Sequence, residues 1–403
     1  MGRAYTGRHV FDAAYERLSL LYKGGHRLVV SFSGGKDSTV CLELAILAAR
    51  DAGRLPVEVI LQDEEIAYPG TYEFIERTAK RPEVSMNWMV LRQPMLNIFN
   101  RAAPYWWVCD PLLDPEEWVR QPPPYAKFDP DKAIELMTNP LRFPVAYSPP
   151  RTTFDWDDGR QCLFAVIGLR TAESAKRLMG LHASGSYLTG SNDLGVFNCR
   201  PIYDWGDGDV WKFIRDIKCD YNPAYDVMYK MGIAKKNLRI GPPTLNVHSL
   251  DALAIASRAW PAWFDKVCKR LNGVRTATQF GRRVCQPHRR YGETWEQCYM
   301  RECVGPDAPE WIRERATTVM IRKLSAHAHH STAPFPENTP CMGCGVSGSW
   351  HALANNMWGG DPYCLKTAGV LEMIEPEFFR PGSGTWAGDW AKILGKKHIK
   401  VLF

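Results

Sequence analysis

The stretch Arg27-Leu-Val-Val-Ser-Phe-Ser-Gly-Gly-Lys-Asp-Ser38 decides the fold of this 403-residue sequence. Its first part, up to Phe32, is a short β-branched and apolar run, which predicts a buried strand. Two adjacent glycines follow, and the segment from Thr39 to Ala52 is rich in Ala and Leu, which predicts a helix. A strand, a glycine-rich loop and a helix in this order predict an anion site made of backbone N–H groups and a helix N-terminus.

The pattern continues outward from this stretch. Residues 5–23 have helical apolar spacing that stops at Gly24-Gly25. Alternating strands and helices at this spacing predict an α/β fold with a doubly wound, mostly parallel sheet and right-handed crossovers. The further predicted elements are strands at Pro56–Leu61, Trp88–Leu91 and Leu163–Gly168, and helices at Tyr72–Lys80, Ala172–Leu178 and Asp207–Ile217.

Two segments depart from this alternation of strands and helices. Residues 101–160 are rich in Trp and Pro with little periodicity, and they predict an irregular insertion at the edge of the sheet where α/β proteins place ligands. Beyond about residue 245 the pattern becomes helical, with helices expected at Leu250–Ser257, Pro261–Leu271 and Pro309–Ser325. We therefore predict a nucleotide-binding domain at 1–245 and a mostly helical, cysteine-containing region at 246–403.

The loop itself carries the chemistry of a phosphate site. Adjacent glycines let backbone N–H groups approach a phosphate without obstruction by a Cβ atom. Serine hydroxyls and Lys36 add donors and charge, whereas the carboxylate of Asp37 is unfavourable there unless Mg²⁺ accompanies the phosphates. The loop is not a Walker A sequence, because the glycines are adjacent and Asp follows Lys.

Three segments in order resemble one family. Ser33-Gly-Gly-Lys-Asp-Ser38, Gly168-Leu-Arg-Thr-Ala-Glu-Ser-Ala-Lys-Arg177 and Arg200-Pro-Ile-Tyr-Asp-Trp205 with Asp209-Val-Trp211 are similar to the motifs of phosphoadenosine phosphosulfate (PAPS) reductase-like proteins. These proteins belong to the adenine nucleotide α-hydrolase superfamily, together with the N-type ATP pyrophosphatases. The resemblance covers about residues 25–215 and implies a HUP-type sheet that binds ATP, PAPS or adenylyl sulfate.

The resemblance and the residue chemistry together give the candidate site. Arg170 and Arg177 are expected to converge on phosphate or sulfate oxygens, and Asp63 to bind ribose hydroxyls or the metal, or to serve as a turn residue. We assign the catalytic roles to Lys36, Asp37, Arg170 and Arg177. The predicted nucleotide-binding residues are Ser31, Ser33, Gly34, Gly35, Lys36, Asp37, Ser38, Asp63, Gly168, Ser174 and Arg200.

Three functions follow from the resemblance. PAPS reductases attack sulfur with a cysteine near the C-terminus, whereas no cysteine follows Cys364 here. The preferred prediction is an ATP pyrophosphatase that acts in sulfur transfer, similar to the enzyme of DNA phosphorothioation systems. The alternatives are a PAPS or adenylyl-sulfate reductase and a nucleotide-dependent regulator that works with a ParB-like partner. A sulfur-donor protein is a further predicted partner of the enzyme.

A cysteine cluster in the C-terminal region predicts a metal site. Cys341-Met-Gly-Cys344 and Cys364 supply three thiolates, and Cys303 or Cys298 supplies the fourth. Cys285 and the histidines at 327, 329, 330 and 351 are alternative ligands. The spacing suits zinc or a [4Fe–4S] cluster and does not choose between them.

Composition sets the remaining expectations. The net charge of +6 suits phosphate-bearing ligands, and the basic stretch Arg282–Arg290 with Tyr291 and Trp295 either contacts DNA or RNA or is a solvated loop. The 15 tryptophans form either stacking surfaces for bases or a Trp-rich core. With 12 cysteines, no apolar signal core and no membrane-length apolar run, we expect a cytoplasmic protein without a disulfide framework or a membrane partner.

Overall fold

The computed structural model describes most of the chain in two compact units. Among the described residues, one unit comprises those in 7–90 and 120–241, and the other comprises those in 94–119 and 243–359. The description covers residues 7–90, 94–100, 105–110, 112–128, 162–184, 187–189, 196–241, 243, 245, 249–281, 286–306, 308, 310–339 and 348–359. We refer to them as unit 1 and unit 2 and treat each by itself. The predicted domain division at residue 245 stays a prediction.

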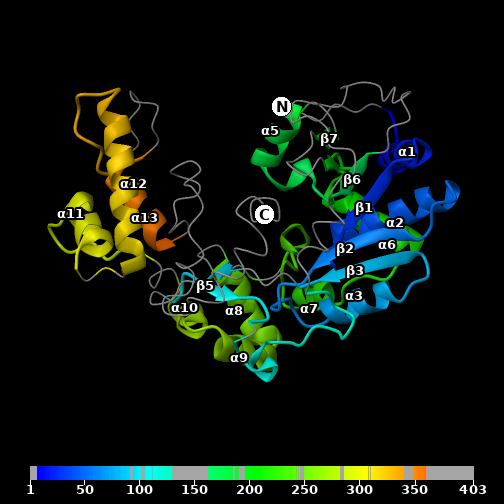
Figure 1. Cartoon of the computed structure of the whole chain (residues 1–403), viewed down its shortest axis with the longest axis horizontal. Coiled ribbons are helices and arrows are strands. Elements are labelled where there is room, and N and C mark those ends of the chain that lie inside the picture. Colours follow the sequence, from blue (N-terminus) through cyan, green and yellow to red (C-terminus); the bar gives the residue numbers. More distant parts are fainter. Residues whose placement is uncertain are drawn as a thin grey trace. The chain divides into compact units, whose positions relative to one another are not determined.

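Unit 1 is built on a six-stranded sheet with the order β3-β2-β1-β6-β8-β7 (Figure 1). Every neighbouring pair is parallel except β7 and β8. The central strands are apolar and buried, as expected for a parallel sheet that is covered by helices. The strands are β1 (Arg27–Ser31), β2 (Val57–Gln62), β3 (Val84–Met89), β6 (Leu163–Val166), β7 (Leu188–Thr189) and β8 (Phe197–Cys199). The α/β fold with a mostly parallel sheet is confirmed.

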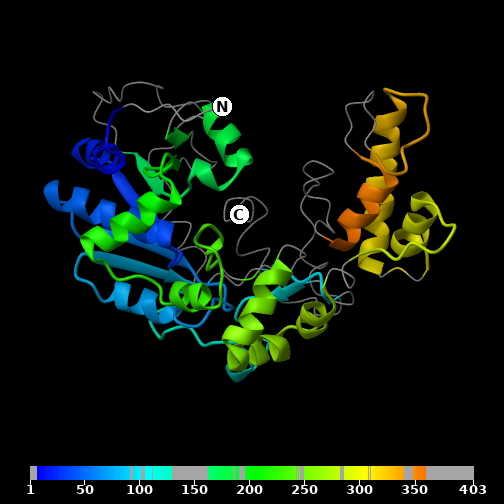
Figure 2. The ribbon, with the colours of Figure 1, turned by 180° about the vertical axis from the view of Figure 1, so that it is seen from behind.

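Helices surround this sheet. α2 lies against α1 and α6, and it shares a cavity wall with α3 (Figures 1 and 2). The helices of unit 1 are α1 (Val10–Lys23), α2 (Lys36–Asp51), α3 (Thr71–Ala79), α5 (Ala175–Ser184), α6 (Asp207–Ile217) and α7 (Ala224–Lys230). Two short 3-10 turns, η2 (Thr171–Glu173) and η3 (Lys235–Asn237), connect them to their neighbours.

Two local predictions differ from the structure. The third strand begins at Val84 rather than Trp88, and residues 84–89 pair in parallel register with the whole of β2. The stretch Val84-Ser-Met-Asn-Trp88 alternates apolar and polar residues, a strand signal that the sequence analysis did not use. The helix expected at Ala172–Leu178 is divided: η2 ends at Glu173, Ser174 has an extended backbone (φ −163°, ψ 150°), and α5 starts at Ala175. Arg170 and Arg177 therefore do not share one helix. Most of the predicted insertion at 101–160 lies outside the described residues.

Unit 2 is mostly helical. Its short antiparallel pair, β4 (Pro94–Leu96) and β5 (Tyr105–Trp107), is followed by the turn η1 (Pro115–Glu117). One group of packed helices comprises α8 (Leu250–Ala259), α9 (Pro261–Arg270) and α10 (Val274–Phe280). Another comprises α11 (Trp295–Tyr299), the π-helical η6 (Met300–Val304), α12 (Glu310–Ala328) and α13 (Trp350–Gly359). In the described parts of both units, no helix combines the length and the apolar character needed to cross a bilayer.

Candidate nucleotide site

The candidate site lies at the carboxyl end of β1, where the order of the sheet reverses. The chain runs outward from β1 to β2 and β3, and it then returns to β6 on the other side of β1. Such a switch point leaves a crevice at the carboxyl ends of the two central strands, where open α/β sheets bind ligands. The loop 33–38 follows β1, and the segment Ile167–Arg170 follows β6, so both predicted motifs reach this crevice.

The loop is held in shape by its own side chains and by Asn222. Gly34 has φ +71°, a left-handed conformation that favours glycine. The Ser33 N–H donates to Ser38 Oγ at 3.2 Å, and the Ser38 hydroxyl donates to the Gly35 carbonyl at 3.0 Å. The buried Asn222 donates its amide to the Gly34 carbonyl at 3.3 Å. Ser33 and Ser38 thus shape the turn, and Ser33 remains exposed.

Lys36 is buried at the start of α2, and its contacts come from a distant part of the chain. Its backbone N–H donates to the Tyr225 hydroxyl at 2.8 Å, and its Nζ donates to the Leu238 carbonyl at 3.1 Å. The side chain is 4% exposed. Burial raises the pKa of Tyr225 well above its usual value, so this hydroxyl stays neutral and accepts the N–H. The segment 238–240 and α7 therefore lie directly over the loop.

Asp37 is paired with cations on both carboxylate oxygens. Arg170 Nε donates to Oδ1 at 2.6 Å, and Lys36 Nζ lies 3.5 Å from Oδ2. Arg170 also donates to Asp207 Oδ1 at 2.8 Å, and its buried Nη1 has no hydrogen-bond partner among the described residues. This arrangement does not fit a magnesium ion held by Asp37, because Arg170 and Lys36 already pair with its two carboxylate oxygens. The sequence-based reason for a metal at this position is not supported, and we derive no step through one.

Gly168 brings the β6 loop against the loop after β1. An added Cβ atom at this position would lie 2.9 Å from the carbonyl carbon of Asp37 and 3.0 Å from the Ser38 nitrogen. Real Cβ atoms essentially never come this close to backbone, so only glycine fits here without a shift. The two motifs are therefore in direct backbone contact, which places Arg170 beside Asp37.

Arg177 and Arg239 add positive charge at the same place. Arg177 has a side chain 40% exposed and forms an ion pair with Glu173. Burial lowers the pKa of Arg177, and the charges of Arg239 and Arg170 lower it further, whereas Asp37 raises it. Arg239 is exposed and stands between Leu238 and Ile240, both of which contact the loop. An anion bound beside these guanidinium groups would offset their mutual repulsion, so the arrangement can hold a phosphate.

Asp63 is buried, and neighbouring groups already bind its carboxylate oxygens. Its carboxylate accepts hydrogen bonds from the Tyr72 hydroxyl at 2.7 Å and the Trp88 indole at 2.8 Å, and it pairs with Arg120. It also accepts the Glu65 N–H at 2.9 Å, which is the local turn that the sequence analysis gave as the alternative role. Asp63 therefore holds the end of β2 in place. Its predicted contact with a ribose stays a prediction, and it would require these bonds to open.

Glu64, next to Asp63, is the titratable group that stands out at this edge. Burial raises its pKa to about 7, and the charge of Asp63 raises it as well. A carboxyl group with this pKa is half protonated near neutral pH and can exchange a proton with a substrate. The sequence analysis gave Glu64 no role.

The other predicted residues occupy the edges of the site. Ser31 ends β1, and Ser174 accepts the Arg177 N–H at 3.2 Å and so caps the start of α5. Arg200 follows β8, burial lowers its pKa, and its buried Nε has no hydrogen-bond partner among the described residues. Asp204 is structural, since it pairs with Arg17 of α1 at 2.7 Å.

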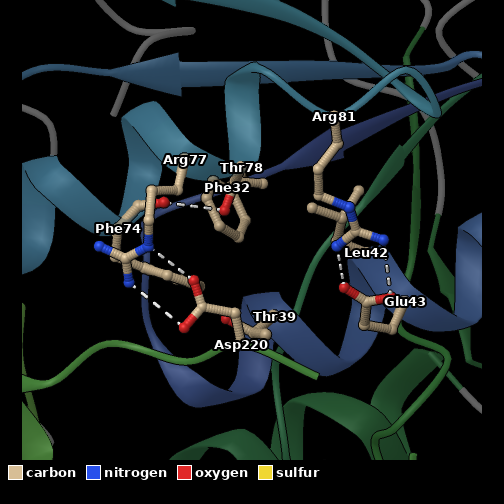
Figure 3. Close-up of a pocket in the computed structure, with 9 residues that line it drawn as sticks. All are labelled: Phe32, Thr39, Leu42, Glu43, Phe74, Arg77, Thr78, Arg81 and Asp220. Carbon is tan, nitrogen blue, oxygen red and sulfur yellow. Dashed lines mark hydrogen bonds and ion pairs between the residues drawn. The ribbon is translucent and has the colours of Figure 1, made fainter. Parts of the chain in front are cut away.

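Two ion pairs brace the elements behind the loop (Figure 3). Arg77 of α3 binds Asp220 with Nε–Oδ2 at 2.8 Å, and Arg81 pairs with Glu43 of α2. Both pairs line a cavity of about 210 Å³ over Phe32, the residue before the loop. Asp220 lies two residues before Asn222, so the first pair fixes the segment that carries Asn222 and Tyr225 to α3.

The predicted metal ligands fall largely outside the description. Cys341, Cys344, Cys364 and Cys285 do not belong to the described residues, so the predicted zinc or [4Fe–4S] site stays a prediction. Cys303 is fully buried in an apolar cluster with Tyr299, Val319 and Trp350. Within the described ranges, no group of three or more His, Cys, Asp or Glu side chains is placed to hold a metal ion.

Tyr225, Asn222 and Arg239 were missed by the sequence analysis. No local sequence pattern indicates that they reach the loop, because each is separated from it by about 190 to 200 residues of sequence. The one available signal is Asn222-Pro223 before a helix, which is typical of a fixed turn.

Comparison with known proteins gives a family match for the first part of unit 1. Residues 27–105, which include β1, the loop, α2 and β2, match the model of the phosphoadenosine phosphosulfate reductase domain. The matched residues contain the first of the three sequence motifs, with Lys36 and Asp37. The resemblance to PAPS reductase-like proteins is confirmed.

The relatives that match this chain are distant in sequence. The protein YbdN of Escherichia coli (strain K12) is 26% identical over 286 residues, which cover 66% of each chain and so just under two thirds of the relative. An adenosine 5′-phosphosulfate reductase of Staphylococcus epidermidis is 22% identical, over 54% of this chain and 72% of its own. A solved PAPS reductase from Candida auris is similar with a TM-score of 0.29 and 12% identity, covering 60% of this chain and 98% of its own. A TM-score this low supports no inference about the ligand or the activity of this chain.

Proposed function

We propose that this chain binds ATP at the carboxyl ends of β1 and β6 and cleaves it between the α- and β-phosphates, which activates an oxygen for sulfur transfer. The observation that carries the proposal is the bond of Arg170 to Asp37 in the loop, with Arg177 close enough to Asp37, Arg170 and Arg239 for their charges to shift its pKa. The family match supports an enzyme that binds an adenine nucleotide. The cleavage of ATP and its use in sulfur transfer are the proposed parts.

The cleavage step assigns a task to each residue. An acceptor oxygen attacks the α-phosphorus, the bond to the bridging oxygen breaks, and pyrophosphate leaves with the electron pair. Charge therefore grows on the leaving pyrophosphate, and the exposed guanidinium groups of Arg177 and Arg239 stabilise it. Arg170 is a positioning residue, since it fixes Asp37 and thereby the first turn of α2. We assign to Glu64 the removal of the acceptor's proton, because burial raises its pKa to about 7.

Three cysteines in the described part of the chain are poorly suited to sulfonate reduction. Reduction needs a thiolate that attacks sulfur, and thiolates form most readily where the pKa is lowered. Burial instead raises the pKa of Cys199 and Cys219 to about 12 and that of Cys298 to about 11. The reductase remains the second candidate because the Staphylococcus epidermidis relative is named as one.

Product analysis tests the proposal. The purified chain is incubated with Mg-ATP, and nucleotides and pyrophosphate are quantified. We expect AMP and pyrophosphate in equal amounts, and a strong loss of both in Lys36→Ala and Arg177→Ala. Sulfite release from adenylyl sulfate with a thiol reductant, without AMP formation from ATP, would show the reductase instead. ATP binding without any turnover would favour the nucleotide-dependent regulator.

A further inference from the structure

Unit 2 contains a cavity that is separate from the nucleotide loop. It has a volume of about 710 Å³ and is formed by the segment around β4 and β5, the segment Asp110–Trp118, and α9. This volume lies within the range of small-molecule sites. We propose that the cavity binds a nucleoside phosphate, with the base on Trp118 and the phosphate on the lysines of α9. This inference does not rest on the proposed ATP chemistry.

The cationic side of the cavity is one face of α9. Lys266, Lys269 and Arg270 have helical spacing i, i+3 and i+4, so they lie next to one another, and all three line the cavity. Arg270 donates Nη2 to the Trp107 carbonyl at 2.7 Å and lies over the Trp106 ring at 5.4 Å. Lys266 and Lys269 are exposed and form no ion pair with any described residue. Two ammonium groups are thus available to a phosphate.

Trp118 provides a prepared stacking face. Its indole N–H donates to the Asp110 carbonyl at 3.0 Å, which fixes the orientation of the ring. The side chain is half-buried, and within the described residues no other ring or cation covers it. Trp106 and Trp107 line the same cavity and are buried. Aromatic rings that are held in place and partly exposed are the surfaces on which bases stack.

The acidic residues narrow the class of ligand. Asp110, Glu116 and Glu117 line the same cavity. Carboxylates repel a purely anionic ligand, but they accept hydrogen bonds from amino groups such as those on adenine, cytosine and guanine. A cavity with stacking rings, carboxylates and free lysines therefore matches a base that carries both an amino group and a phosphate. Either a free nucleotide or one residue of a single strand has this chemistry.

Binding measurements on the full chain test the proposal with two probes, 5′-AMP and a single-stranded adenine hexanucleotide. We expect Trp118→Ala and the double variant Lys266→Glu/Lys269→Glu each to weaken binding about tenfold or more. The double variant should also flatten the dependence on salt, because two phosphate contacts are lost. The matched control Lys23→Glu/Lys80→Glu makes the same charge change at exposed lysines of unit 1 and should leave binding unchanged.

The outcomes separate this site from the loop. Binding of both probes supports a site for free nucleotides, and binding of the hexanucleotide alone supports a site for a strand. In both cases Arg177→Ala/Arg239→Ala, which alters only the loop site, should leave the cavity-dependent binding intact. If neither probe binds, or if binding is unaffected by both cavity variants, the proposal is overturned. The lysine variant changes exposed side chains, so it remains informative even if Trp118→Ala fails to fold.

Discussion

Arg170 and Asp37 are 133 residues apart in the sequence, yet the guanidinium Nε of Arg170 lies 2.6 Å from the carboxylate Oδ1 of Asp37. This bond joins the loop after β6 to the first turn of α2, and Gly168 makes the close approach possible. It also explains how a carboxylate is tolerated in an anion site, since a buried arginine neutralises it. The site is therefore assembled by the switch point of the sheet rather than by the glycine-rich loop alone.

Replacement of Arg170 by Ala should lower the free energy of unfolding by about 2–3 kcal/mol. The change removes one partner each from the Asp37 and Asp207 carboxylates, and the figure is below that of fully buried pairs because both carboxylates reach solvent. Denaturant unfolding measures it. The control Arg215→Ala removes an exposed pair with Asp216 and should change stability by less than about 1 kcal/mol. Equal effects of the two variants would contradict the assigned role.

Replacement of Gly168 by Ala should destabilise the chain by about 1–3 kcal/mol, because the new methyl group meets the backbone of Asp37 and Ser38. Gly180 offers a matched control. It lies inside α5, an added Cβ atom there meets nothing within 4 Å, and Gly180→Ala should stabilise the chain by up to about 1 kcal/mol. Opposite signs of the two shifts in melting temperature are expected. A neutral Gly168→Ala would show that the two loops do not touch in solution.

Arg177→Ala and Arg239→Ala should each weaken ATP binding about tenfold or more, since each removes a charged donor from the same anion site. Calorimetric titration at two salt concentrations measures the loss and its dependence on ionic strength. Arg50→Ala serves as the control, because Arg50 is exposed at the far end of α2. An unchanged affinity in both variants would remove these arginines from the site.

Glu64→Gln should stabilise the protein above neutral pH and have little effect at pH 5. The pKa of Glu64 is about 7 in the folded chain, above its usual value of 4.5, so the unfolded state loses the proton first as pH rises. The native chain therefore loses stability between those two pKa values, and the neutral amide avoids this loss. Melting curves of both proteins at pH 5 and pH 8 should differ by a few degrees, about 2–4 °C, at pH 8 only. A shift of equal size at both pH values would contradict the raised pKa.

Tyr225→Phe should cost about 1 kcal/mol of stability, because the buried Lys36 N–H loses its acceptor. Tyr221→Phe is the control, since its hydroxyl donates to Asp226 at an exposed position and should matter less. Hydrogen exchange of the Lys36 amide gives a second readout, and it should accelerate in Tyr225→Phe alone. Unaltered exchange would show that α7 does not close over the loop in solution.

The sequence by itself determined the elements whose signals are local. The apolar run before Ser33 predicted β1, the paired glycines predicted the loop, and the Ala- and Leu-rich segment predicted α2. Each of these signals depends only on residues that are close together in the sequence. The helix Asp207–Ile217 was predicted with its bounds for the same reason. The start of β3 was missed although it could be predicted, because Val84-Ser-Met-Asn-Trp88 alternates apolar and polar residues as a strand does.

Only the tertiary structure decided which groups meet at the loop. Tyr225, Asn222 and Arg239 reach it because the chain after β8 returns across the carboxyl ends of the strands, and no pattern near the loop encodes that return. The pairing of Asp37 with Arg170, and the saturation of Asp63 by Tyr72, Trp88 and Arg120, likewise depend on strand order. A sequence motif shows which types of side chain a site contains. The balance of charge among those side chains depends on neighbours from distant parts of the chain, which only the packed sheet brings together.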